Sequence, residues 1–326
     1  MSEDVMTVQQ VGSAVVRVLD ELDRVVVGKR EALELVLCAV LAGGHVLLED
    51  LPGVGKTVMA RSVARVLGLQ FTRVQFTPDL LPSDLTGANV LDPQSGSVGF
   101  RAGPVFTHVL LADELNRTPP RTQAALLEAM AERQVSTDGT TRALPDPFVV
   151  LATENPIEYE GTFSLPEAQL DRFMARVRLG YLDAAQEMTL LRRHAAHETD
   201  PAILDVVAGP EIVRSWMTVM EQVEVHDDVL RYAVDLTRAT RTHQHVELGS
   251  SVRGTMAVVG MARVRAAFSG RDFVTPDDVA AVAVAALGHR ISVRPELWLR
   301  QVGGDAVVRD VLDQVQPPKT RPGAEP

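Results

Sequence analysis

One stretch of the chain, residues 46–57, has the residue types and spacing that phosphate binding needs: Val46-Leu47-Leu48-Glu49-Asp50-Leu51-Pro52-Gly53-Val54-Gly55-Lys56-Thr57. Gly53 and Gly55 can turn successive backbone N–H groups toward phosphate oxygens, and the helix expected after them adds the positive end of its dipole. Lys56 would reach the β- and γ-phosphates, and the Thr57 hydroxyl would ligate Mg²⁺. The predicted nucleotide-binding set is Pro52, Gly53, Val54, Gly55, Lys56, Thr57 and Val58.

Asp50 departs from the usual phosphate-loop pattern, which has a glycine at this position. The prediction rests on the second half of the loop, Pro52 to Thr57, because that half carries the phosphate contacts. The alternative is a glycine-rich turn that merely joins a strand to a helix.

A second apolar run, residues 109–112, ends in two acids, Asp113 and Glu114. A phosphate loop needs one carboxylate to hold the shell of a Mg²⁺ ion and another to orient or deprotonate a water molecule. We expect Asp113 to serve the metal and Glu114 the water. The alternative is a solvated end of a strand.

Asn155 follows a third apolar run, residues 148–153. Ligands of such sheets bind at the carboxyl ends of the strands, so Asn155 is expected beside the γ-phosphate, where its amide can position water. An asparagine before a proline also favours a turn, which is the alternative.

Arg172 is a candidate arginine finger. Charge on the γ-phosphate in the transition state needs a donor that stays protonated and has a rigid fork. The alternative is an arginine paired with Asp171 or another nearby acid.

These residues need a parallel sheet to bring them together. The continuously apolar runs at 46–48, 109–112 and 148–153 are typical of parallel strands buried on both faces. Helices are expected at 8–26, 31–41, 57–67 and 121–132, the last with Ala124, Leu127 and Ala131 at helical spacing, and hairpins at 88–102 and 134–144. The pattern predicts an α/β fold, a doubly wound parallel sheet with a phosphate loop.

The composition changes after Leu182. Helical segments at 184–197, 211–221, 227–241, 251–268 and 276–287 predict an all-α lid domain over 183–315. It follows an α/β core with a leading helix over 1–182. The proline-rich residues 316–326 are expected to be a disordered tail.

Composition limits the function classes. The chain has 326 residues, of which 46% are apolar and 23% charged, as in a soluble protein with two domains. No apolar run reaches the roughly 18 residues that span a bilayer, and no secretory leader is visible, so a cytoplasmic location is expected. A net charge of −11, from 32 basic and 43 acidic side chains, argues against nucleic acid as a partner.

Two other groups of residues were considered for chemistry. Cys38, the single cysteine, lies in an apolar run and is expected in the core. The pairs His194 with His197 and His243 with His245 have metal-ligand spacing, but no carboxylate or cysteine set surrounds them in the sequence.

The residues discussed so far lie in four longer motifs: Glu49-Asp50-x-Pro-Gly-x-Gly-Lys-Thr, Ala112-Asp113-Glu114-Leu115-Asn116-Arg117-x-Pro-Pro, Ala152-Thr153-Glu154-Asn155-Pro156-Ile157-Glu158-Tyr159-Glu160-Gly161-Thr162 and Leu165-Pro166-Glu167-Ala168-Gln169-Leu170-Asp171-Arg172-Phe173. Together they resemble the MoxR family of AAA+ ATPases, of the helix-2-insert branch that is related to the motor subunits of magnesium chelatases. The resemblance covers nearly the whole chain.

The resemblance implies a homo-oligomer, a hexameric ring, with ATP and Mg²⁺ at the subunit boundary. Asn155 would be the sensor 1 residue, and Arg172 would reach the ATP of the neighbouring subunit. Arg253, in the segment 248–254, would be the sensor 2 contact to the γ-phosphate; its alternative is a surface arginine at a helix start. Val27 and Gly28 would line the adenine pocket. Both hairpins would point toward a central pore.

The chain departs from the family pattern at two places. Many relatives have glutamine where Glu154 stands, which changes the charge next to sensor 1. The sequence Ser251-Val252-Arg253-Gly254 differs from the commoner Ser-Pro-Arg-Ala, which loosens the geometry of the helix start without removing the arginine.

The resemblance implies an ATP-hydrolysing, chaperone-like remodeller or activator of partner proteins, with a partner that carries a von Willebrand factor A (VWA) domain. Two alternatives are the motor subunit of a metal chelatase and a nucleotide-dependent binding switch. A DNA motor is disfavoured by the acidic balance of the chain.

Overall fold

The structure is a computed structural model that describes residues 6–91, 93, 97–155, 162–296 and 302–318. The chain divides into two compact units, an α/β unit of residues 14–217 and a helical unit of residues 1–13 and 218–326. This division differs from the expected domains at both ends of the core: the segment 183–217, expected in the lid, belongs to the α/β unit, and residues 1–13, expected in the core, are grouped with the helical unit. The family-specific motif at 156–161, most of the hairpin tip at 92–96 and most of the tail at 316–326 lie outside the described residues.

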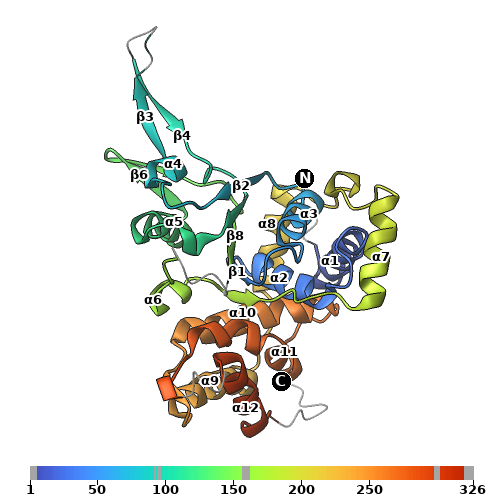
Figure 1. Ribbon diagram of the computed structural model, residues 1–326. Helices are drawn as coiled ribbons and strands as arrows, with labels where there is room; N and C mark the ends of the chain where they lie inside the picture. The colour runs from blue at the N-terminus through green and yellow to red at the C-terminus, as the bar shows by residue number, and fades with distance from the viewer. Residues whose placement is uncertain (1–5, 92, 94–96, 156–161, 297–301, 319–326) are drawn as a thin grey trace. The chain divides into compact units, whose positions relative to one another are not determined.

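The elements up to residue 221 comprise two leading helices, the strands and helices of an α/β unit, and two hairpins (Figure 1). They are α1 (Val8–Asp23), α2 (Arg30–Leu41), β1 (Val46–Glu49), α3 (Lys56–Val66), β2 (Phe71–Gln75), α4 (Pro82–Thr86), β3 (Gly87–Leu91), β4 (Val98–Ala102), β5 (Val109–Asp113), η1 (Leu115–Arg117), α5 (Pro120–Glu132), β6 (Gln134–Thr137), β7 (Thr140–Ala143), β8 (Val149–Glu154), α6 (Glu167–Leu170), β9 (Ala175–Val177), α7 (Ala184–Ala195), η2 (Pro201–Ile203) and α8 (Pro210–Glu221).

A parallel sheet of five strands, in the order β2-β5-β8-β1-β9, organises the described part of the α/β unit. Helix α5 covers one face, and α2 and α3 cover the other (Figure 1). Because helices bury both faces, the central strands β5 and β8 are buried along nearly their whole length, which explains their unbroken apolar runs. The predicted doubly wound fold is confirmed.

The α5 side of the sheet contains a large apolar core. Leu110 and Ala112 of β5 pack there with Leu126, Leu127 and Met130 of α5. Other members of this core are Leu47, Phe76, Phe148, Val150, Ala152 and Phe173.

Two of the three side chains at helical spacing in α5 are not on its buried face. Leu127 is buried, but Ala124 and Ala131 are exposed, whereas Gln123 is fully buried. The Gln123 side-chain nitrogen donates hydrogen bonds to the backbone carbonyls of Leu115, Thr118 and Phe163, which gives the amide N–H groups partners in the interior. The apolar spacing alone could not reveal this, because the partners lie outside the helix.

Two antiparallel hairpins extend the α/β unit. Strands β3 and β4 form a hairpin that projects away from the sheet (Figure 1) and exposes Val90, Leu91 and Val98. Strands β6 and β7 are joined by Asp138 and Gly139, with φ angles of 51° and 75°. Two consecutive positive φ angles are the conformation that an Asp-Gly hairpin turn predicts.

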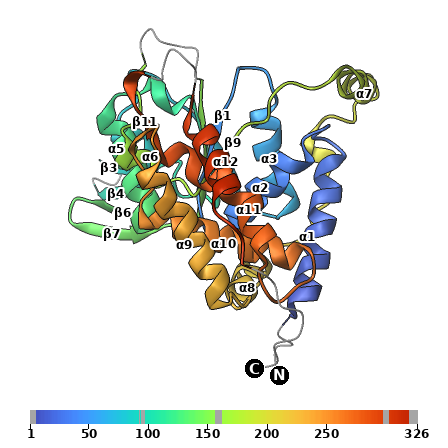
Figure 2. The same cartoon turned by 90° about the horizontal axis from the view of Figure 1, so that it is seen from below.

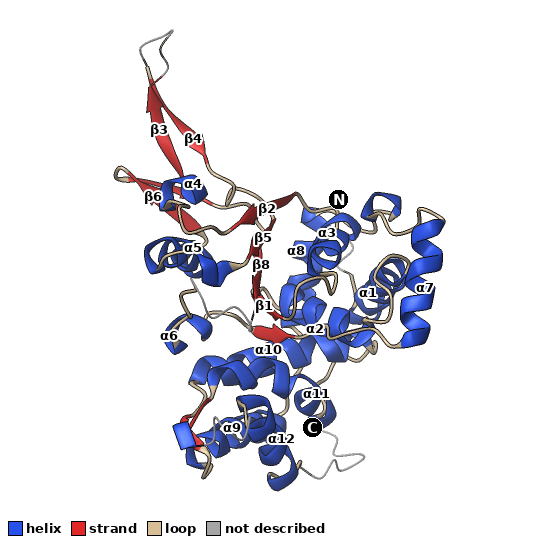
Figure 3. Cartoon of the chain, viewed as in Figure 1, coloured by secondary structure: helices blue, strands red, loops and turns tan. Residues whose placement is uncertain are grey.

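The helical unit consists mostly of helices, which Figure 3 colours blue throughout the chain and Figure 2 shows from below. Its elements are α9 (Asp227–Thr242), β10 (Val246–Leu248), α10 (Val252–Phe268), α11 (Pro276–Leu287), η3 (Gly288–Arg290), β11 (Ser292–Val293) and α12 (Gly304–Gln314). Helices α10 and α11 pack together, and α12 packs on α9 and α11.

Short side-chain hydrogen bonds set the helix starts in this unit. The Ser251 hydroxyl accepts the N–H of Arg253 at the start of α10. At the start of α11, Thr275 and Asp278 form a capping box. Arg271 donates to both carboxylate oxygens of Asp278, at 2.7 and 2.8 Å.

The predicted helices of this region are present, and the structure adds α12 and the small sheet of β10 with β11. Among the described residues, no helix combines the length and the apolar character that crossing a membrane requires.

Candidate functional site

The phosphate loop has the backbone geometry that its glycines permit. Gly53 and Gly55 have φ angles of +86° and +96°, which other residues rarely adopt. No atom outside the loop lies within 4 Å of where a Cβ would stand on either glycine, so the concave side of the loop is open. Gly55 is the N-cap of α3, and Lys56 and Thr57 form its first turn. The N–H groups of this turn are donors without helical partners, which suits an anion.

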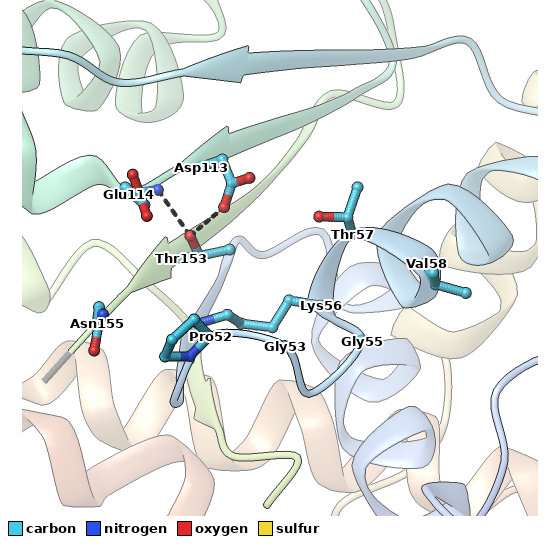
Figure 4. A pocket seen from close by; sticks show the side chains of 10 residues that line it. All are labelled: Pro52, Gly53, Gly55, Lys56, Thr57, Val58, Asp113, Glu114, Thr153 and Asn155. Carbon is cyan, nitrogen blue, oxygen red and sulfur yellow. Dashed lines mark hydrogen bonds between the residues drawn. The ribbon is translucent and has the colours of Figure 1, made fainter. Parts of the chain in front are cut away.

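A cavity of about 320 Å³ lies above this loop (Figure 4). Its size is that of a small-molecule site. The residues that line it are Pro52, Gly53, Gly55, Lys56, Thr57, Val58, Asp113, Glu114, Thr153 and Asn155. The loop and the carboxyl ends of β5 and β8 therefore contribute to one cavity. Lysine, hydroxyl, helix N–H and carboxylate groups fit a Mg²⁺-bound phosphate chain.

Thr153 connects the two acids that follow β5. Its hydroxyl donates to Asp113 Oδ1 at 2.7 Å and accepts the backbone N–H of Glu114 at 2.8 Å (Figure 4). Thr153 is 1% exposed, so neither partner can replace this hydroxyl with water. One buried side chain thus positions both predicted catalytic acids.

Asp113 also forms an ion pair with an arginine, Arg73. Nε and Nη2 of Arg73, on β2, donate to Asp113 Oδ2 at 3.0 and 2.6 Å. Both carboxylate oxygens of Asp113 therefore already accept hydrogen bonds. This arrangement suits a carboxylate that holds Mg²⁺ through a water molecule better than one that binds the ion directly.

Glu114 has an unusual backbone conformation. Its φ of 59° and ψ of 50° place a non-glycine residue in the left-handed region, which costs on the order of 1 kcal/mol. The hydrogen bond from its N–H to Thr153 and that from the Arg117 N–H to its carbonyl hold this conformation. Its carboxylate accepts a hydrogen bond from the Gln75 amide and lies 3.3 Å from Arg117 Nε.

Lys56 lies against backbone carbonyls. Its Nζ donates to the carbonyl of Asp50 at 2.6 Å and to that of Glu154 at 3.4 Å. Burial lowers the pKa of Lys56, against the opposing charges of Asp50, Asp113 and Glu114. The ammonium group is thus partly dehydrated before a phosphate binds.

Glu154 lies in a cluster of charges at the ends of β1, β8 and β9. It pairs in register with Glu49, which forms ion pairs with Arg176 at 2.8 Å and Arg178 at 3.0 Å. Burial and the charge of Glu49 raise the pKa of Glu154 to about 7, while Arg176 acts in the opposite direction. Glu154, next to Asn155, is therefore partly protonated near neutral pH.

The remaining predicted residues lie outside the lining of the cavity. Val54 is a partly exposed residue of the loop. Val27 and Gly28 lie between α1 and α2, and a Cβ on Gly28 would stand 2.4 Å from the Gln186 side chain of α7. Arg172 is an exposed residue of the α/β unit after α6, and Arg253 is an exposed residue of α10 in the helical unit.

Sequence reasoning missed Arg73 and Gln75 and did not foresee the bridging role of Thr153. Arg73 and Gln75 alternate on β2, so the sequence could have placed them on one face of a strand. It could not show that β2 lies next to β5, because strand order is decided by the tertiary structure.

The structure also supplies a carboxylate near one histidine pair. His243 Nε2 lies 3.8 Å from Asp310 Oδ2, and possible ligand atoms of His243, His245 and Asp310 lie within 4.8 Å of one another. However, Nδ1 of His243 accepts the backbone N–H of His245 at 3.3 Å. The ring proton then resides on Nε2, which favours a His–Asp pair over a metal ligand at that nitrogen.

Two family models match the chain. The model described as "ATPase family associated with various cellular activities (AAA)" matches residues 45–175, and the one described as "AAA lid domain" matches residues 238–311. The first span contains the whole lining of the cavity. Fold, site and models together define an ATPase of the AAA class.

Three similar proteins show to which family of AAA ATPases the chain belongs. The protein YeaC of Bacillus subtilis (strain 168) is 43% identical over 305 residues, which are 94% of this chain and 95% of YeaC. Chaperone MoxR1 of Mycobacterium tuberculosis is 36% identical over 312 residues, which are 93% of this chain and 82% of MoxR1. A crystal structure from Cytophaga hutchinsonii has a TM-score of 0.88 at 36% identity, covering 95% of this chain and 96% of that one. The chain belongs to the MoxR family of AAA+ ATPases.

The bridge through Thr153 yields a first prediction. Thr153→Val removes the hydroxyl at nearly constant shape and leaves a buried acceptor and a buried donor unpaired, so kcat for ATP should fall about 10- to 100-fold. Thr153→Ser keeps the hydroxyl and should remain within a few-fold of the wild type. Steady-state ATPase assays measure kcat, and nucleotide titration measures the affinity of each variant for ATP. Thr237→Val, the same change at a buried threonine of α9, controls for stability; equal activities of the Val and Ser variants at position 153 would refute the bridge.

The raised pKa of Glu154 yields a second prediction. Between pH 4.5 and about 7 the folded chain keeps a proton that the unfolded chain has lost, so Glu154 makes stability fall as pH rises through this window. Glu154→Gln, which is neutral at every pH, should therefore match the wild type near pH 4.5 and be more stable at pH 8, by roughly 3 kcal/mol at most. Unfolding curves at both pH values test this, with the exposed Glu128→Gln as control. A difference that does not change with pH would contradict it.

Proposed function

We propose that this chain is an ATP-hydrolysing ring ATPase of MoxR type that remodels or activates a partner protein. The observation that carries the proposal is the cavity in which Lys56 and Thr57 face Asp113 and Glu114 (Figure 4). Phosphoryl transfer requires charge stabilisation and an oriented water, and this set of groups supplies both.

The residues of the cavity divide the work of hydrolysis. The N–H groups of the loop and Lys56 bind the phosphates, and Thr57 and Asp113 would hold Mg²⁺, which would supply positive charge against the phosphates. Glu114 orients and deprotonates the attacking water, and Asn155, which is 7% exposed at the end of β8, positions that water from the other side.

Two arginines complete the site from outside the cavity. Arg172 is exposed, which supports its role as a finger that enters the site of a neighbouring subunit. Arg253, at the capped start of α10, would contact the γ-phosphate as sensor 2. Val27 and Gly28 would contact the adenine. This arrangement requires a homo-oligomer, and we propose a hexameric ring.

The partner class is inferred from the family. The similarity to a protein named chaperone MoxR1 supports a remodelling role. We propose a partner with a VWA domain, on which the exposed apolar side chains of the β3–β4 hairpin could act when ATP is hydrolysed.

The shared site makes the ATPase rate depend on assembly. Specific activity should rise steeply with protein concentration, because an isolated subunit has no finger in its site. Arg172→Ala should abolish this rise and lower kcat by about 10³-fold or more, as for other arginine fingers. Arg172→Lys should rescue little, since an ammonium group lacks the fork. The exposed Arg17→Ala is the matched control, and a rate that does not depend on concentration would contradict a shared site.

The role of Glu114 makes a trap possible. Glu114→Gln should bind ATP with little change in affinity and hydrolyse it at least 100-fold more slowly, because the amide cannot take a proton from water. With ATP, this variant should retain a purified VWA-domain protein from the same genome during size-exclusion chromatography, and with ADP it should release it. Slow turnover without nucleotide-dependent retention would refute the proposed partner, and unchanged turnover would refute the role of Glu114.

A further inference from the structure

Asp50 connects the phosphate loop to a distant segment of the same unit. Its Oδ2 accepts hydrogen bonds from the backbone N–H groups of Leu179 and Gly180, the latter at 2.9 Å. Leu179 and Gly180 lie between β9 and α7, far from the loop in sequence. A glycine at position 50, which the usual phosphate loop has, could accept neither hydrogen bond through its side chain.

Lys29 holds the same segment from its other side. Its Nζ donates to the carbonyls of Gly180 at 3.0 Å and Tyr181 at 2.9 Å, and Lys29 is only 8% exposed. Gly180 has a φ of +64°, which lets this short turn direct N–H groups to one side and carbonyls to the other. The segment 179–181 is therefore bonded both to the phosphate loop and to the residue that follows Val27 and Gly28.

The backbone of Asp50 is in turn bonded to Lys56, with 2.6 Å between Nζ and the carbonyl oxygen. A phosphate oxygen is a stronger acceptor for an ammonium group than a carbonyl, because both partners are then charged. When Lys56 binds a phosphate oxygen of a nucleotide instead, the carbonyl of Asp50 loses this hydrogen bond. The carboxylate of Asp50 accepts the N–H groups of Leu179 and Gly180, so a shift of Asp50 would be transmitted to these two residues.

We propose that Asp50 is a positioning residue that couples nucleotide binding at Lys56 to the segment 179–181 and so to the start of α7. This inference rests on the proposed function, because it requires a nucleotide at the phosphate loop. The charge of Asp50 has a separate effect, on nucleotide affinity, because a carboxylate beside the loop repels a triphosphate. Charge alone therefore predicts that removing Asp50 tightens nucleotide binding and leaves the segment 179–181 unchanged.

Hydrogen–deuterium exchange of peptides that span 178–183 separates these effects. In the wild type, the amides of Leu179 and Gly180 should exchange slowly, and Mg²⁺ with the non-hydrolysable analogue AMPPNP should change their rate. In Asp50→Gly, these amides should exchange at least tenfold faster without nucleotide, and the response to AMPPNP should disappear. Asp50→Asn keeps one oxygen acceptor and should give intermediate rates.

Two further variants make the test specific. Lys29→Met removes the other set of bonds, so it should speed exchange in the segment while the response to AMPPNP remains. Asp235→Asn, which removes an exposed carboxylate from α9, should match the wild type in both measurements. If the Asp50→Gly chain fails to fold, Asp50→Asn still tests the proposal, because asparagine has nearly the same shape as aspartate.

The proposal is overturned if Asp50→Gly and Asp50→Asn keep the slow exchange of the wild type, or if Lys29→Met abolishes the AMPPNP response as completely as Asp50→Gly does. A wild-type chain that binds no AMPPNP would refute the proposed function, and the coupling with it. Normal binding and hydrolysis in the wild type, together with an unaltered AMPPNP response in Asp50→Gly, would refute the coupling alone.

Discussion

The parallel register of β1, β8 and β5 is the constraint on which the site depends. Leu48 pairs with Thr153 and Ala112 with Ala152, so the carboxyl ends of these strands meet at one edge of the sheet. The phosphate loop leaves from the end of β1, and the acids leave from the end of β5. Thr153 of β8 lies between them and is bonded to both acids. A shift of one residue would turn Thr153 to the opposite face and break both bonds.

The electrostatics of this edge follow from the same arrangement. Asp113 and Glu114 line a site that we propose binds a triphosphate, and Glu49, Asp50 and Glu154 lie nearby, so local partners must limit the repulsion. Arg73 pairs with Asp113, and the Asp50 carboxylate accepts backbone N–H groups. Burial beside Glu49 raises the pKa of Glu154 to about 7, so part of its negative charge is removed near neutral pH. These contacts leave Lys56 and the first turn of α3 to meet the phosphates.

Much of the fold could be predicted from local pattern. Apolar runs identified the buried strands β1, β5 and β8, and helical spacing located α1, α2, α3, α5 and the helices from α7 to α11, because burial imposes these periods on each element separately. Strand β9 spans only Ala175–Val177, and β10 and β11 are as short, so they carry too little pattern to be recognised. Helix α12 was missed although it is amphipathic, and the buried face of α5 was misplaced because Gln123 is buried through hydrogen bonds to other segments.

The sequence by itself determined the chemistry of the loop and of the acids, and the family to which they point, since both are encoded by neighbouring residues. Only the tertiary structure decided which groups these residues meet. The partners of Asp113, Glu114 and Asp50 come from β2, β8 and the segment after β9, which lie 39 to 130 positions away along the chain. Contacts at such separations leave no local period in the sequence, because they depend on strand order and register, which form only when the whole sheet assembles.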